Sequence, residues 1–462
     1  MAMARRRADR PHPNPNPNVL VFFTDQQRWD TTGLGGNPLD LTPNFDRMAR
    51  AGTHLRHFFT CQPVCAPARS CLQTGQYATT TGVWRNGIGL RPDAVTLADV
   101  FGQAGYHTGY IGKWHLARSH GRGPVAADER GGYAEWLGAN ALEGTSDAYR
   151  TVVYDGEGRE VYLPGYRVDA LTDAAIRFID RCQAEPFFLF LSFLEPHHQN
   201  HLDDYPPPDG YRERYTGRWT PPDLAALQGS APQHLGGYYG MVKRLDEALG
   251  RVRDALRSLG LDRNTIVVFT SDHGCHFKTR NGEYKRSCHE SSIHVPAALC
   301  GPGFDGGGEV RPLVSLVDLA PTLYAAAGLD QPNGVQGRSL LPLLRDADSP
   351  WPQEVFVQIS ESEVGRAVRT QRWKYGVRAP DAEGGRQMGA PRYVETFLYD
   401  LEADPYELHN LVGLESHATL ARALAERLLR RMAEAGEPPA EIAAAETRRS
   451  GQRRVDPDEV LV

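Results

Sequence analysis

Apolar runs of strand length alternate with amphipathic segments along the first three quarters of the chain. The runs 19–23 and 266–269 are apolar at every position, as is typical of strands buried on both faces of a sheet. Within 241–256 apolar residues recur three or four positions apart, which predicts a long helix ending at Gly260. Further strands are predicted at 54–60, 106–112 and 187–193, and further helices between Thr42 and Gly52 and at 67–74, 97–104 and 166–183.

This alternation predicts an α/β fold built on a large, mainly parallel sheet with helices on both faces. In such sheets the functional groups gather at the carboxyl ends of the strands. Asp25 comes just after the strand at 19–23, and Asp272 and His273 come just after the strand at 266–269. We therefore expect these three side chains to share one site.

The pattern changes after about residue 350, where shorter, alternating strands replace the buried runs. Strands at 355–360, 368–377 and 397–401 and a helix at about 416–435 predict a small antiparallel sheet with one helix. The predicted organisation is a catalytic domain at 18–350 and an α+β subdomain at 351–437. A Pro- and Asn-rich disordered lead-in at 1–17 and a polar, mobile tail at 438–462 flank them.

Composition narrows the possible partners. The 462 residues carry a formal net charge of −6, and no apolar run approaches the roughly 18 residues of a membrane span, so neither nucleic acid nor a membrane is expected. The first residues lack the apolar stretch of a secretion signal, and the seven cysteines show neither a disulfide framework nor zinc spacing. A cytoplasmic location is therefore expected, and the sequence predicts no oligomeric state.

The segment Cys65-Ala-Pro-Ala-Arg69, continued by Ser-Cys-Leu-Gln-Thr-Gly75, is the most informative motif. Read alone, it could be a buried cysteine in a proline-capped loop, because free cysteine is among the most buried residue types. The full segment resembles the core signature of the type I sulfatases, in the alkaline phosphatase superfamily, and implies the fold of that superfamily. The resemblance also implies that a formylglycine-generating enzyme oxidises Cys65 to formylglycine. The hydrate of this aldehyde attacks sulfate esters, and Arg69 orients it.

A second segment, 105–115, ends in Gly-Lys113-Trp-His115 and resembles the second sulfatase signature. A surface lysine and a structural histidine are the alternative. Because the side chains of a strand alternate, Lys113 and His115 are predicted to point to the same face. The resemblance implies that Lys113 stabilises the hydrated aldehyde and that His115 accepts a proton from its second hydroxyl.

The candidate metal ligands are Asp25, Gln26, Asp272 and His273. Their oxygens suit a hard divalent cation, so Ca²⁺ is the first expectation, while the imidazole also admits Mn²⁺ or zinc. Read alone, an aspartate after a strand is more commonly a cap or turn residue. The resemblance implies one metal at these strand ends, with the oxygen that replaces the Cys65 sulfur as a further ligand. Many members pair Asp-Asp with Asp-Asn. The present Asp-Gln and Asp-His are similar to the branch that contains choline sulfatases and phosphonate monoester hydrolases.

Three further positions complete the candidate site. The resemblance implies that His197, in Pro-His197-His198, contacts and protonates the leaving group, and that Lys285 binds sulfate oxygens. Asn86 lies at the distance from Cys65 at which the choline sulfatase branch has an asparagine that touches the sulfate. A plain Asn-Gly turn explains Asn86 equally well.

The function that these residues imply is hydrolysis of a sulfate monoester, borne by a small molecule or a saccharide, to an alcohol and inorganic sulfate. One alternative is a phosphonate monoester or phosphodiester hydrolase that uses the same site. An alternative of another class is an inactive protein that binds sulfated ligands and in which Cys65 stays a thiol.

Overall fold

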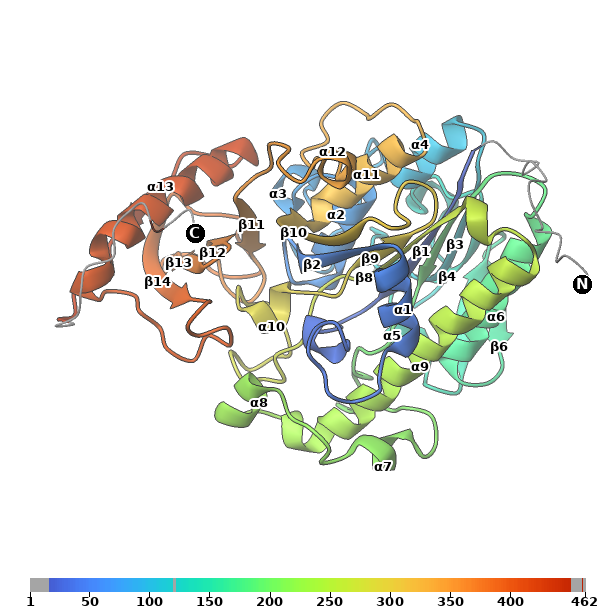
Figure 1. The fold of residues 1–462 in the computed structure, drawn as a ribbon, viewed down its shortest axis with the longest axis horizontal. Helices are drawn as coiled ribbons and strands as arrows, with labels where there is room; N and C mark the ends of the chain where they lie inside the picture. The colour runs from blue at the N-terminus through green and yellow to red at the C-terminus, as the bar shows by residue number, and fades with distance from the viewer. Residues whose placement is uncertain (1–15, 119–121, 450–458, 460–462) are drawn as a thin grey trace, which may run out of the picture.

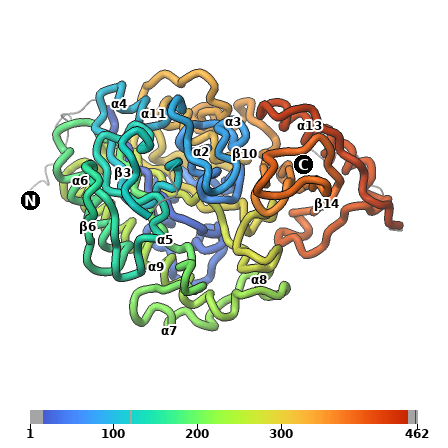
Figure 2. Tube along the Cα trace, turned by 180° about the vertical axis from the view of Figure 1, so that it is seen from behind, coloured from blue at the N-terminus to red at the C-terminus, as the bar shows by residue number. Residues whose placement is uncertain are grey.

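The computed structural model describes residues 16–118, 122–449 and 459. The lead-in expected at 1–17 lies almost wholly outside these residues. Figures 1 and 2 show a large body around one sheet and a smaller lobe that carries the C-terminal strands and helix. None of the helices within the described ranges is long and apolar enough to cross a membrane.

The large sheet has ten strands in the order β10-β2-β9-β8-β1-β7-β3-β4-β5-β6. Its central neighbours β8, β1, β7, β3 and β4 all pair in parallel, whereas β9, β5 and β6 pair only antiparallel. The predicted mainly parallel α/β sheet is therefore confirmed. The strands are β1 (Asn18–Thr24), β2 (Thr53–Phe59), β3 (His107–Lys113), β4 (Glu135–Ala139), β5 (Thr151–Asp155), β6 (Glu160–Leu163), β7 (Phe187–Ser192), β8 (Thr265–Ser271), β9 (Ala298–Cys300) and β10 (Gly308–Ser315).

Helices cover both faces because the central strands are apolar on both. In β1, Leu20 and Phe22 join one buried cluster, and Val19, Val21 and Phe23 join another. The first cluster is covered by α1 (Pro43–Ala51), α6 (Arg167–Arg181) and the long α9 (Ala231–Ser258). The second is covered by α2 (Cys65–Thr74), α4 (Leu97–Gln103) and α11 (Leu319–Ala326). Figure 1 shows α9 crossing the near side of the sheet, and Figure 2 shows α2 from behind.

Short helices lie in the connections between these elements. The α-helical ones are α3 (Ala78–Thr81), α5 (Leu142–Thr145), α7 (Tyr211–Tyr215), α8 (Pro222–Ala226), α10 (Glu290–Ile293) and α12 (Leu341–Arg345). The 3₁₀ turns are η1 (Trp29–Thr31), η2 (Ala127–Glu129), η3 (Asp262–Asn264), η4 (Leu316–Asp318) and η5 (Glu415–His417).

The second sheet has five strands in the order β11-β12-β13-β14-β15, with α13 (Ala418–Glu434) packed on it. It is antiparallel apart from the pairing of β14 with β15. This confirms the expected small antiparallel sheet with one helix. The strands are β11 (Glu354–Ile359), β12 (Gly365–Thr370), β13 (Trp373–Arg378), β14 (Arg392–Asp400) and β15 (Glu441–Ala443).

One expectation for this region is corrected. The single strand predicted at 368–377 is two strands, because the Thr370 hydroxyl accepts the Trp373 N–H at 2.9 Å and turns the chain between β12 and β13. Within the tail predicted from 438, the three residues of β15 pair in parallel with β14. Residues 450–458 and 460–462 of that tail lie outside the described residues.

A buried ion cluster joins the C-terminal sheet to α10 of the large body. Lys374 Nζ on β13 lies 2.7 Å from Glu290 Oε1 and 2.6 Å from Glu407 Oε1, and both carboxylates are buried. Burial opposes ionisation of Glu290, yet Lys374 and Arg369 hold its pKa well below its usual range. Separating the two parts of the molecule would therefore break buried ion pairs, at a large cost in free energy.

We predict that Lys374→Met lowers the free energy of unfolding by about 3 kcal/mol or more, because it removes the cation that the buried carboxylates of Glu290 and Glu407 share. Denaturant unfolding followed by circular dichroism measures this loss. Arg311→Met is the matched control, since the Arg311 side chain is 80% exposed and pairs with Glu309 at the surface. A loss of less than about 1 kcal/mol in Lys374→Met, the range of a surface ion pair, would contradict this view of the cluster.

Candidate active site

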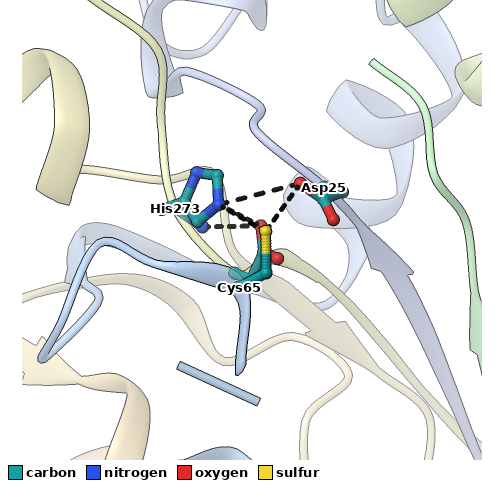
Figure 3. Close-up of side chains that lie close together, drawn as sticks. Asp25, Cys65 and His273 are labelled. Carbon is teal, nitrogen blue, oxygen red and sulfur yellow. Dashed lines mark hydrogen bonds and ion pairs between the residues drawn. The ribbon is translucent and has the colours of Figure 1, made fainter. Parts of the chain in front are cut away.

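Four potential metal-ligating side chains meet at the carboxyl ends of β1 and β8. Because β1 and β8 are parallel neighbours, Asp25 and Asp272 are brought side by side just beyond their last residues. Cys65 opens α2 and places Sγ 3.4 Å from His273 Nε2 and 3.8 Å from Asp25 Oδ1. One ligand atom from each of these four residues lies within 4.8 Å of the others. Figure 3 shows Asp25, Cys65 and His273 pointing toward one another.

The two aspartates are held so that one oxygen of each faces the centre. Arg69 donates to Oδ2 of Asp25 at 2.9 Å and to Oδ2 of Asp272 at 3.2 Å, and Lys113 Nζ lies 2.8 Å from the same Asp25 oxygen. The Oδ1 atoms lie instead 3.7 and 3.5 Å from His273 Nε2. Burial and the charge of Asp25 raise the pKa of Asp272 to about 6, so a cation between the inner oxygens would stabilise both carboxylates.

Gln26 and His273 also carry potential metal-ligating atoms. Gln26 adopts a left-handed backbone with φ of 69° and donates its amide Nε2 to the Tyr205 hydroxyl at 2.9 Å, which leaves its buried Oε1 without a hydrogen-bond partner. His273 Nδ1 lies 3.0 Å from the Gly274 carbonyl, and this contact directs Nε2 to the centre. Two carboxylates, one amide oxygen and one imidazole therefore fit a hard or borderline divalent cation.

Cys65 lies in an electropositive environment. Lys285 Nζ is 2.9 Å and Lys113 Nζ 3.8 Å from its Sγ, and the residue is fully buried at the first turn of α2. Burial opposes ionisation, but Lys113, Lys285 and His273 hold the pKa of this thiol well below its usual range. The position stabilises a negative charge on whatever group it carries.

The backbone conformation that places His115 at the site differs from the predicted strand. Strand β3 ends at Lys113, and His115 lies beyond it with a left-handed φ of 62°, its N–H donating to the Asn140 carbonyl at 2.8 Å. The expected alternation of a strand therefore does not orient this side chain, and that argument was wrong. The turned backbone nevertheless places His115 at the cavity that contains Cys65.

The two neighbouring histidines have different surroundings. His197 Nε2 lies 3.2 Å from Lys285 Nζ, and its Nδ1 lies 2.6 Å from the His198 carbonyl. Burial and Lys285 lower the pKa of His197. His198 stacks on the His197 ring at 4.3 Å and packs against Tyr284 on its other side. His197 is thus the one that contacts the charged groups around Cys65.

Asn86 lies in a turn and also lines the cavity that contains Cys65. Gly87 after it has a φ of 85°. Its side-chain Oδ1 accepts the N–H of Ala66, beside Cys65, at 3.0 Å. That bond leaves Nδ2 as the donor available to a ligand in the cavity, which Asn86 lines.

The cavity has a volume of about 270 Å³ and includes charged residues that the sequence did not single out. Glu143, on α5, lies 3.2 Å from Lys113 Nζ through Oε2. Burial opposes its ionisation, but Lys113, His115 and His197 lower its pKa to about 2. No motif surrounds this residue, so no signal in one sequence could have found it. The other charged or amide side chains not predicted are Asn200, Lys278, Glu283 and Arg286.

Comparison with known proteins agrees with this fold. The sequence model of the sulfatase family matches residues 17–329, and that of the C-terminal part of N-sulphoglucosamine sulphohydrolase matches 282–434. An ulvan-active sulfatase of Formosa agariphila is 29% identical over 440 residues, covering 91% of this chain and 81% of its own length.

Two solved structures share the architecture. A Bacteroides fragilis structure named for the sulfatase YidJ has a TM-score of 0.81 at 26% identity, covering 94% of this chain and 98% of its own. The phosphonate monoester hydrolase of Agrobacterium radiobacter has a TM-score of 0.71 at 25% identity, covering 91% and 96%. The molecule is therefore a hydrolase of the alkaline phosphatase superfamily. The chain belongs to the sulfatase family and is a sulfuric ester hydrolase.

We predict that Glu143→Gln strengthens inhibition by inorganic sulfate about five- to tenfold, since it removes a negative charge from the anion cavity at nearly constant shape, a change of roughly 1 kcal/mol. It should also lower kcat, because Lys113 loses one of its two anionic partners. Steady-state inhibition kinetics measure both effects. Glu157→Gln, at an exposed turn, is the control. Unchanged or weaker sulfate inhibition in Glu143→Gln would show that this carboxylate does not act on the bound anion.

Proposed function

We propose that the protein hydrolyses a sulfate monoester through formylglycine formed from Cys65, beside one divalent cation. The observation that carries this proposal is the convergence on Cys65 of three potential metal-ligating side chains, from Asp25, Asp272 and His273, and of the cations of Lys113 and Lys285. An uncharged buried thiol would need neither the cations nor the carboxylates. The proposal requires a formylglycine-generating enzyme as the partner that matures the protein.

The cation would be held by the oxygens of Asp25, Gln26 and Asp272 and by His273 Nε2, with the group at position 65 beside it. Ca²⁺ is the first candidate, because most of the donors are oxygens, and Mn²⁺ is the alternative. When bound, the cation would supply positive charge to the sulfate oxygens and to the nucleophilic hydroxyl. The aldehyde hydrate would supply that hydroxyl and a second one whose deprotonation restores the aldehyde.

The side chains around position 65 would bind the anion and hold protons. Lys285 Nζ, already 2.9 Å from Cys65 Sγ, is placed to bind a sulfate oxygen, and Asn86 Nδ2 can donate to another. Arg69 and Lys113 would keep the hydrated aldehyde in place through the charge they share with Asp25. These fixed charges act where negative charge develops as the ester bond breaks.

Two histidines would move the protons. His197 Nδ1 donates to the His198 carbonyl, so its Nε2 shares the proton of Lys285, and this pair would protonate the departing alcohol. His115 lines the cavity, its side chain is hydrogen-bonded to Cys65, and it would accept the proton of the second hydroxyl. The polar rim formed by Asn200, Lys278 and Glu283 suits the hydroxyl groups of a saccharide or another small polar alcohol.

A phosphonate monoester or phosphodiester is the second candidate substrate. The Asp-Gln and Asp-His pairs favour it, as does the similarity to the phosphonate monoester hydrolase structure. Comparing kcat/KM for an aryl sulfate with that for an aryl phosphonate monoester and a phosphate diester separates the two candidates. A higher value for the sulfate, lost in Cys65→Ala, supports the first. A higher value for either phosphorus ester would overturn it in favour of the second.

We expect His197→Gln to reduce kcat/KM at least a hundredfold for alkyl or sugar sulfates but only severalfold for 4-nitrophenyl sulfate, because only a basic leaving alcohol needs a proton. A series of sulfate esters with leaving groups of different pKa measures this dependence. His198→Gln, which changes the ring packed behind His197, is the control and should show no such dependence. Equal losses across the His197→Gln series would remove the proton-donor role.

Removal of the divalent cation with a chelator should abolish turnover while leaving the far-UV circular dichroism nearly unchanged, because buried apolar clusters on both faces of the large sheet hold its helices in place. We expect Ca²⁺ to restore activity. Asp25→Asn should show the same loss without recovery. Full turnover after exhaustive chelation, with the metal content measured as zero, would exclude a catalytic cation.

A further inference from the structure

A second group of potential metal-ligating side chains lies at the amino ends of β3 and β4, whereas the active site lies at the carboxyl ends of the parallel strands. His107 begins β3, Glu135 begins β4, and Cys182 follows the last residue of α6. One ligand atom from each, a nitrogen, an oxygen and a sulfur, lies within 4.8 Å of the others. The chain thus brings three different ligand types from three elements to one point.

This group is well separated from the active site. Strand β3 runs from His107 to Lys113, and Lys113 contacts Asp25 in the candidate metal site. At about 3.3 Å per residue, the two ends of the strand are about 20 Å apart. A ligand at His107 therefore has no contact with the groups that surround Cys65.

The three side chains are held near one another by their own elements. His107 Nε2 lies 3.1 Å from Glu135 Oε2, and the imidazole packs against Phe178 of α6 with ring centres 5.5 Å apart. Cys182 is only 3% exposed, and Glu185 Oε1 lies 4.0 Å from His107 Nδ1. Glu185 is therefore close enough to orient the imidazole from behind or to act as an additional ligand.

The surroundings of the thiol argue against a reactive or redox role. Burial, together with the carboxylates of Glu135 and Glu185, raises the pKa of Cys182 to about 11. A thiol kept protonated in this way is a poor nucleophile. A divalent cation would instead favour the deprotonated form of Cys182, because it stabilises the thiolate and is itself attracted by the carboxylates.

We propose that His107, Glu135 and Cys182 bind Zn²⁺ as a structural site, with water or Glu185 as the fourth ligand. A thiolate, an imidazole and a carboxylate form a ligand set that zinc accepts in tetrahedral geometry, whereas Ca²⁺ and Mg²⁺ require oxygen ligands. On binding, the Cys182 thiol releases its proton to solvent and its sulfur takes the metal.

One cation competes with the metal for this site. The guanidinium of Arg181 contacts Glu135 Oε1. The Arg181 side chain is 56% exposed, so it can turn to solvent at little cost. The site would fasten β3, β4 and the end of α6 together, and metal binding would stabilise the folded state by mass action.

Titration of the full-length protein with Co²⁺, in the presence of excess Ca²⁺, tests the site. Co²⁺ substitutes for Zn²⁺ and absorbs in the near ultraviolet when a thiolate binds it. We expect this absorption to saturate at one equivalent, to disappear on addition of Zn²⁺, to be absent in Cys182→Ala and to persist in Cys65→Ala. No thiolate absorption, or absorption that persists in Cys182→Ala, would overturn the proposal.

Two further variants test the site without changing Cys182. His107→Gln should weaken Co²⁺ binding at least tenfold, and Arg181→Ala should strengthen it severalfold because Glu135 loses its competing partner. Sulfatase activity should be unchanged in Cys182→Ala. Co²⁺ affinity that is the same in wild type, His107→Gln and Arg181→Ala would also overturn the site.

Discussion

The active site depends on how its two buried aspartates are paired. In each of them, one carboxylate oxygen faces cationic side chains and the other faces the candidate metal position. Arg69 and Lys113 neutralise the outer oxygens of Asp25 and Asp272, while the inner oxygens face His273 and Cys65. Neither carboxylate could stay ionised at zero exposure without these cations. The arrangement holds a compact negative centre inside a positive shell, which suits a divalent cation in the middle and an oxyanion above it.

Different helices and strands supply the parts of this arrangement. Parallel strands β1 and β8 bring the aspartates together, α2 carries Cys65 and Arg69, and β3 ends at Lys113. The C-terminal sheet also takes part. Glu361, between β11 and β12, lies 2.7 Å from Arg286 and accepts the backbone N–H of Asn86 at 2.8 Å. The smaller sheet therefore supports the rim of the cavity as well as the buried cluster around Lys374.

The sequence predicted the parts of the site that follow from local rules. Buried runs end before Asp25 and Asp272, and the geometry of parallel sheets requires such ends to meet. His115 was placed at the right site for a wrong reason, because its left-handed backbone follows from contacts with Asn140 and not from the alternation of a strand. Glu143 could not be predicted, since only the three-dimensional fold brings α5 to Lys113. The turn at Thr370 was missed although the four polar residues 369–372 interrupt the apolar-polar alternation there.

The central claim is that position 65 carries an aldehyde in the active enzyme. Mass spectrometry of the peptide that spans residue 65, from a preparation whose active-site concentration has been titrated, tests this claim most directly. The account predicts that the fraction of peptide with an aldehyde in place of the thiol equals the fraction of active molecules. Full activity from protein in which this peptide carries only the intact cysteine would contradict it.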